Sequence, residues 1–119
     1  MPKRDDILLI EDMVDSCTTI YDYLGDLSFD NFIKDRKTVD AVTRNFEILG
    51  EAASMTSEEL RYNNIHIEWK KIKEFRNVLI HEYFGVDYEI MWRIIKFQLP
   101  NQFDFLQQLL ETLKSKTED

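Results

Sequence analysis

The chain has 119 residues, of which 44% are apolar and 32% are charged, and its net charge is −8. These values are typical of one soluble globular domain, here residues 1–119, and they exclude a disordered chain. A domain of this size would gain stability by dimerising. The acidic charge also argues against a general nucleic-acid binder, which needs Lys and Arg for phosphates, so no DNA partner is expected.

The first predicted helix runs from about Arg4 to Leu24, and Gly25 is expected to end it. Its apolar residues recur at steps of three and four, a heptad-like spacing that places them on one face. They are Ile7, Ile10, Val14, Cys17, Tyr21 and Leu24.

Cys17 is the only cysteine and cannot form an intrachain disulfide, so its place on this apolar face indicates a buried thiol in a reducing cytoplasm. No signal peptide or apolar run of spanning length is present. We therefore expect a cytoplasmic protein without a membrane partner.

Two helices and a connector are predicted next. A short helix from Ser28 to Lys34 is capped by Ser28, and a longer one is capped by Thr38. Residues 55–67 then form a connector in which Ser57 starts a single helical turn. His66 lies in this connector and is interpreted as an ordinary loop histidine. One cysteine and two scattered histidines lack the spacing of a zinc site, so no metal is expected.

The segment from Trp69 to Gly85 predicts the central helix, because glycine and proline are absent until Gly85. Its apolar residues follow a three-four spacing and define a buried stripe: Ile72, Phe75 and Leu79. Its polar residues have no obvious role in a core, and they are Arg76, Asn77, His81 and Tyr83.

After Gly85, Asp87 predicts the cap of a helix that buries Ile90, Ile94 and Phe97. Pro100 is expected to break this helix and to start the last one. The last helix again has a three-four apolar spacing, in Phe103, Leu106, Leu110 and Leu113. Because no alternating strand pattern is present, we predict an all-α, up-and-down bundle of four to five main helices.

The polar set of the central helix suits phosphodiester chemistry. His81 can exchange protons near neutrality with an ordinary pKa of ~6.5, and Arg76 is a permanent cation whose fork of donors fits a phosphate. Asn77 can hydrogen-bond to a substrate, and Tyr83 offers a hydroxyl and a flat ring. On a regular helix Arg76 and His81 diverge by roughly 140°, so they would flank a cleft, and a two-fold axis would bring two such sets together.

The same residues resemble the signature of HEPN-domain ribonucleases, in particular the HepT-like toxins encoded beside MNT-type nucleotidyltransferase antitoxins. The matching order is Arg76, Asn77, three apolar residues, His81, Glu82 and Tyr83. Residues 46–52, which end in Gly50-Glu51-Ala52, resemble a second hallmark of the family. The resemblance extends from Arg4 to about Leu113.

The resemblance implies a HEPN-like homodimer that cuts RNA without a metal or other cofactor, at a cleft between two protomers. His81 would be the acid/base, Arg76 the phosphate clamp and Asn77 a positioning donor, while Glu51 would be a partly buried acid that orients the basic group. Tyr83 could stack on a base, or its hydroxyl could accept AMP from the nucleotidyltransferase antitoxin. The antitoxin would then neutralise the toxin by this modification, by binding it in a larger hetero-oligomer, or by both.

Simpler interpretations stay open at this stage. Any one of these residues could have a structural role, for example Arg76 in an ion pair with Glu51 or His81 as a helix-end histidine. The whole chain could be a non-catalytic partner of a nucleotidyltransferase or a purely structural helical dimer. The charge distribution allows RNA contact, because residues 61–96 hold seven basic and five acidic residues and the rest of the chain is at −10.

Overall fold

The computed structural model describes residues 4–80 and 87–117, with the side chains of residues 4, 76, 78–80 and 117 excepted. Within these ranges the chain is helical and contains no strand. The helices are α1 (Arg4–Leu24), α2 (Phe29–Lys34), α3 (Arg36–Met55), α4 (Glu58–Asn63), α5 (Trp69–Ile80), α6 (Tyr88–Arg93), the π-helical η1 (Ile94–Gln98) and α7 (Leu99–Thr117).

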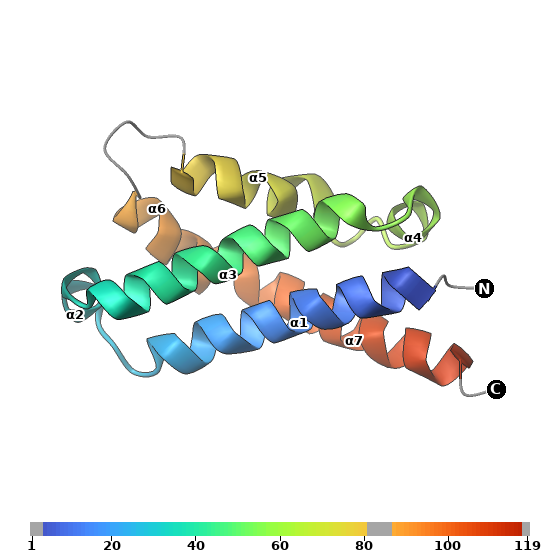
Figure 1. Ribbon diagram of the computed structural model, residues 1–119, viewed down its shortest axis with the longest axis horizontal. Coiled ribbons are helices and arrows are strands. Elements are labelled where there is room, and N and C mark those ends of the chain that lie inside the picture. Colours follow the sequence, from blue (N-terminus) through green and yellow to red (C-terminus); the bar gives the residue numbers. More distant parts are fainter. Residues whose placement is uncertain (1–3, 81–86, 118–119) are drawn as a thin grey trace.

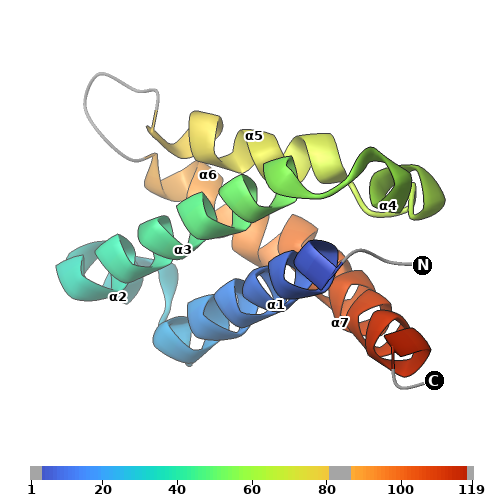
Figure 2. The same cartoon turned by 45° about the vertical axis from the view of Figure 1, so that its right-hand side comes forward.

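The four long helices α1, α3, α5 and α7 run up and down along the long axis of the molecule (Figure 1). Helix α2 joins α1 to α3 at one end, and α4 lies at the other end, where α1 begins and α7 ends (Figure 2). The predicted all-α bundle is therefore confirmed. No helix in the described part of the chain combines the length and apolar composition needed to cross a membrane.

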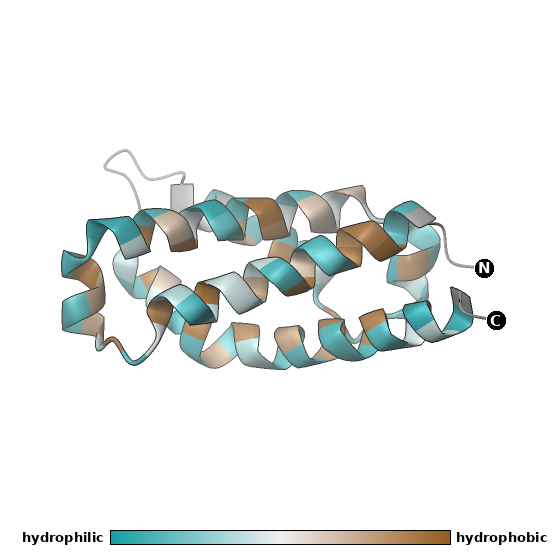
Figure 3. Cartoon of the chain, turned by 60° about the horizontal axis from the view of Figure 1, so that its bottom comes forward, coloured by the Kyte–Doolittle hydropathy of each residue, from teal (hydrophilic) through white to brown (hydrophobic). Residues whose placement is uncertain are grey.

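The core lies between the long helices, where their apolar faces meet (Figure 3). In α1 the bounds are as predicted, and Gly25 follows with a positive φ of 50° that closes the helix. The buried stripe of α1 is centred slightly away from the predicted one, because Tyr21 and two other predicted members are only half-buried. Its fully buried apolar residues are Ile10, Met13, Cys17, Ile20 and Leu24.

Three predicted helix caps are confirmed. Ser28, Ser57 and Asp87 each accept a hydrogen bond from the backbone N–H three residues further on, at 3.2, 3.2 and 3.1 Å. Each bond satisfies one of the backbone donors that a helix start leaves without an intrahelical partner. The turn predicted after Ser57 is the six-residue helix α4.

The predicted cap at Thr38 is wrong, because Asp35 caps α3 and the helix begins at Arg36. The backbone N–H of Thr38 donates to Asp35 Oδ1 (3.1 Å), and its hydroxyl donates to Oδ2 (2.8 Å). These hydrogen bonds lower the pKa of Asp35. A carboxylate offers two acceptors to the helix start, which explains why it caps in place of the nearby threonine.

The prediction that Pro100 breaks the preceding helix is wrong, because the chain passes from α6 through η1 into α7 without a gap. In the wider π turn the N–H of Leu99 donates to the carbonyl of Ile94, five residues back. Pro100 has no N–H to continue this pattern to the carbonyl of Ile95. That carbonyl instead accepts a hydrogen bond from the Tyr21 hydroxyl on α1 (2.9 Å), so the backbone group is satisfied.

The π turn also changes which residues face the core. Phe97, which was predicted to be buried, is 78% exposed, whereas Met91, Ile94 and Ile95 are buried. One extra residue per turn rotates the following side chains relative to a regular α-helix. Sequence spacing based on 3.6 residues per turn therefore assigns Phe97 to the wrong face.

We expect Tyr21→Phe to destabilise the fold, because it leaves the Ile95 carbonyl without its donor. The expected cost is ~1–2 kcal/mol, or roughly 4–8 °C in melting temperature for a domain of this size. Thermal unfolding followed by circular dichroism measures this. The matched control is Tyr23→Phe on the same helix, where the side chain is 53% exposed and the melting temperature should not change. Equal stability of the two variants would contradict the role of the hydroxyl.

Candidate functional site

Helix α5 carries the polar residues of interest and is held against α3 by its apolar side. Ile72 and Phe75 are buried. The ring of Phe75 meets the ring of Phe46 on α3 edge to face, with 5.8 Å between centroids and 88° between planes. An edge-to-face contact fixes the distance and the orientation between the two rings, so the side of α5 opposite Phe75 faces solvent.

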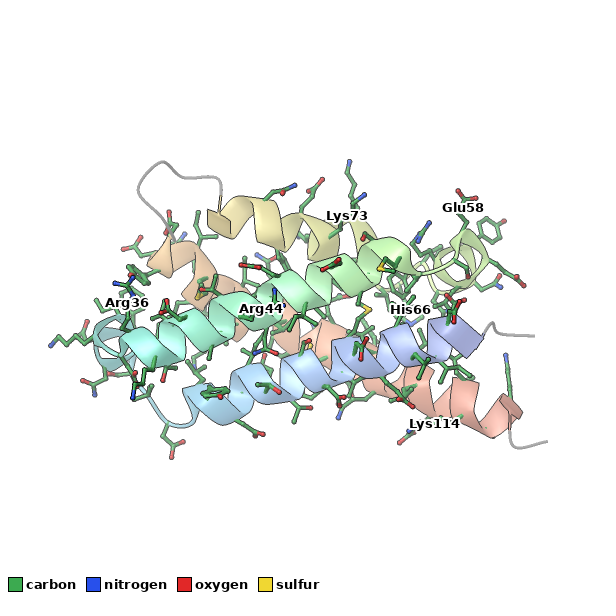
Figure 4. The ribbon with its side chains drawn as sticks, in the orientation of Figure 1. Arg36, Arg44, Glu58, His66, Lys73 and Lys114 are labelled. Atoms are coloured by element: carbon green, nitrogen blue, oxygen red, sulfur yellow. The ribbon has the colours of Figure 1, made fainter. Side chains whose placement is uncertain are left out.

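The outward side of α5 is polar. Lys70, Lys73 and Asn77 are exposed, and their spacing of three and four places them along one face of the helix. Figure 4 shows Lys73 projecting from α5 away from the bundle. Asn77, the predicted positioning donor, is thus open to solvent in the single chain. The backbone of Arg76 lies next to it, in the last turns of α5.

The remaining central site residues fall outside the described part of the chain. His81 and Tyr83 lie between Ile80 and Asp87, and the side chain of Arg76 is also outside the description. Their predicted roles therefore stay predictions.

Glu51 is exposed in the single chain, and its predicted role as a partly buried acid near the cleft stays a prediction. The buried face of α3 at this level is formed by Leu49, Ala52 and Ala53. Glu51 lies two residues after Leu49, roughly 200° around the helix, and so points away from this face. Both Glu51 and Asn77 are described, and no hydrogen bond joins their side chains.

In the described part of the chain, two hollows flank α5. The larger is a groove of about 810 Å³ beside the first half of the helix, where α3 ends and α4 returns, and it contains Arg61, Lys70, Lys71 and Lys73. The smaller, of about 350 Å³, lies between α5 and the α6–η1 segment and includes Arg93. The basic composition of residues 61–96 indicated that cations would gather, but spacing alone did not show which of them share a groove.

The other reactive groups of the described residues have ordinary surroundings. His66 is exposed and its ring packs edge-on against Phe105 at 4.9 Å, as expected for a loop histidine. Cys17 is buried, and burial raises the pKa of its thiol to about 12, which leaves it unreactive near neutrality. Among the described residues no group of His, Cys, Asp or Glu is placed to hold a metal ion.

Comparison with known proteins identifies relatives over most of the chain. The family model described as "Ribonuclease HepT-like" matches residues 13–109. A protein named "Putative RNase MJ0127", from Methanocaldococcus jannaschii, is 34% identical over 119 residues, which are 100% of this chain and 98% of that protein. A protein named "Probable ribonuclease HepT", from Thermococcus cleftensis, is 32% identical over 99 residues, which are 83% of this chain and 90% of that protein. No solved structure matches the chain.

Proposed function

The chain belongs to the HepT-like ribonuclease family, and on that premise we propose that it is a metal-independent RNA endonuclease that acts as the toxin of a toxin-antitoxin pair. The observation that supports this most is the family match over residues 13–109, which includes the ordered set Arg76, Asn77, His81 and Tyr83. The geometry of α5 agrees with it, because the helix is fixed on α3 and turns Asn77 toward solvent.

The proposed reaction uses the 2′-hydroxyl of RNA as the nucleophile. His81 removes the proton of that hydroxyl, whose oxygen attacks the adjacent phosphorus, and the bond from phosphorus to the 5′-oxygen breaks. The leaving 5′-oxygen receives a proton from an imidazolium. Arg76 stabilises the charge on the phosphoryl oxygens, and Asn77 positions the phosphate. The products are a 2′,3′-cyclic phosphate end and a 5′-hydroxyl end.

Two copies of the chain supply the complete cleft in this proposal. A two-fold axis beside the end of α5 would place one Arg76 and one His81 on each side of the RNA, so that one imidazole can act as base and the other as acid. The polar outward face of α5, which no other part of the described chain covers, supports this arrangement. We expect a cytoplasmic homodimer that can assemble further with its antitoxin.

The partner in this proposal is an MNT-type nucleotidyltransferase that acts as the antitoxin. It would transfer AMP to the hydroxyl of Tyr83, two residues after His81. The added phosphate carries negative charge and bulk, so it would compete with the RNA phosphate for Arg76. Binding of the antitoxin over the same cleft could add to this inhibition.

Digestion of total RNA by the purified chain in the presence of EDTA tests the proposed function. We expect cleavage without added metal, with a cyclic phosphate at the 3′ end of each upstream fragment. Sequencing of the fragment ends maps the cut sites. RNA left intact by a folded, dimeric protein would contradict the proposal and would favour a non-catalytic partner of the nucleotidyltransferase.

A further inference from the structure

The groove beside the first half of α5 differs in charge from the rest of the molecule. Its lining includes four basic side chains, Arg61, Lys70, Lys71 and Lys73, and two acidic ones. The chain as a whole is at −8, so the part outside the groove is strongly acidic. A polyanion is therefore repelled by most of the surface and attracted at this groove.

Two of these cations are available to a ligand. Lys71 pairs with Glu68 at 3.6 Å, but Lys70 and Lys73 are exposed and have no acidic partner among the described residues. Arg61 is anchored at the groove wall, where it donates hydrogen bonds to the carbonyl and, at 3.1 Å, to the hydroxyl of Thr56. The groove therefore combines an ordered cation with two free ones.

The position of the lysines on α5 adds a second argument. The first turn of α5 has no acidic residue, as is also true of α3 and α7, and it contains Lys70 and Lys71. The start of a helix carries partial positive charge, which disfavours Lys70 and Lys71 there. A bound anion would reverse this repulsion, because it interacts favourably with both the lysines and the helix end.

The groove lies on the same side of α5 as Asn77, the proposed site residue on this helix whose side chain is described. Lys70, Lys73 and Asn77 share one face of α5, and the seven residues from Lys70 to Asn77 span ~10 Å along the helix axis. A stacked nucleic-acid strand rises ~3.4 Å per nucleotide, so this distance corresponds to about three nucleotides.

We infer that this groove binds the backbone of single-stranded RNA about three nucleotides from the phosphate that is cut, with Lys70 and Lys73 on successive phosphates. This inference rests on the proposed function, because the substrate of the cleavage site identifies the polyanion. The groove then contributes affinity and sets the minimum length of a good substrate, and it takes no part in the chemical step.

The test compares wild type with the double variant Lys70→Gln/Lys73→Gln. The binding probe is a 2′-O-methyl oligouridylate, which cannot be cut through its 2′-oxygen, titrated at several salt concentrations. The slope of log affinity against log salt should fall by about 1.4, at ~0.7 per lost phosphate contact. For a cleavable RNA containing a mapped site, KM should rise while kcat stays unchanged.

The matched control is Lys34→Gln/Lys37→Gln, which makes the same change in charge at exposed lysines near α2, at the other end of the bundle. Its salt slope and KM should equal those of wild type. The inference is wrong if the Lys70/Lys73 variant keeps the wild-type salt slope, which is the result expected when the groove binds an acidic protein partner. It is also wrong if both double variants lose the same amount of RNA affinity. If the wild type cuts no RNA, the proposed function fails, while the oligouridylate titration still decides whether the groove binds RNA.

Discussion

His81→Ala is expected to abolish detectable RNA cleavage and growth inhibition while the fold stays intact. On the proposed mechanism, the variant loses both the base that activates the 2′-hydroxyl and the acid that protonates the leaving oxygen. Loss of a positioned acid or base typically costs ~10²–10⁴ in rate. Cleavage of a mapped RNA in EDTA measures the loss, and circular dichroism with gel filtration checks fold and dimer.

The chain provides a matched control, because it has only one other histidine. His66 is exposed in the connector before α5, and His66→Ala should cleave at the wild-type rate. Undiminished cleavage by the His81 variant would remove that residue from the mechanism. Equal losses in both variants would indicate that the change acts through the fold or through RNA affinity.

Adenylylation of Tyr83 is expected to switch the enzyme off. Incubation with the partner nucleotidyltransferase and ATP should add AMP to the wild-type chain and lower cleavage by at least ~10²-fold, comparable to the loss of an acid or base, because the added phosphate occupies Arg76. Intact-mass and peptide mass spectrometry locate the modification, and the cleavage assay follows its effect on the separated protein.

Tyr83→Phe should accept no AMP and should stay active after the same treatment. The control is Tyr88→Phe at the start of α6, an exposed tyrosine whose loss should leave both modification and inhibition unchanged. If AMP is found on another residue, or if the modified chain cleaves RNA at the wild-type rate, the switch does not act through Tyr83.

Local signals in the sequence were sufficient for most of the helices. The bounds of α1 follow from apolar spacing and Gly25, and three helix starts follow from Ser28, Ser57 and Asp87. These signals act within four residues, so no knowledge of the tertiary structure is needed to interpret them. The bundle then follows from four long amphipathic helices joined by short connections.

The incorrect predictions depend on contacts between distant residues or on competition between neighbours. Pro100 can lie in a continuous helix because Tyr21, 79 residues earlier, supplies the missing donor to the Ile95 carbonyl. The cap of α3 is Asp35 in place of the predicted Thr38, and Asp35 binds Thr38 with both carboxylate oxygens. The first outcome depends on a distant residue, whereas the second follows the local preference of helix starts for Asp over Thr.

The sequence predicts the residue types of the candidate site. It does not predict which of these residues are exposed or which cations share a groove. Family resemblance selected Arg76, Asn77 and His81, and the structure places Asn77 on the outward face of α5. Glu51 is exposed because Leu49 and its neighbours form the buried face of α3, which depends on how α3 packs. The basic groove depends likewise on the return of α4 toward α5, which brings Arg61 beside lysines that follow it by nine residues or more.

The most direct test of metal-independent cleavage through the RNA 2′-hydroxyl is a single atom replacement in the substrate. After a cut site has been mapped, an RNA with one 2′-deoxynucleotide immediately before the scissile phosphate is incubated with the wild-type chain in EDTA. We predict that this RNA stays intact, whereas the unmodified RNA is cut and carries a cyclic phosphate. Cleavage of the deoxy-substituted RNA at the same position and rate would contradict the mechanism.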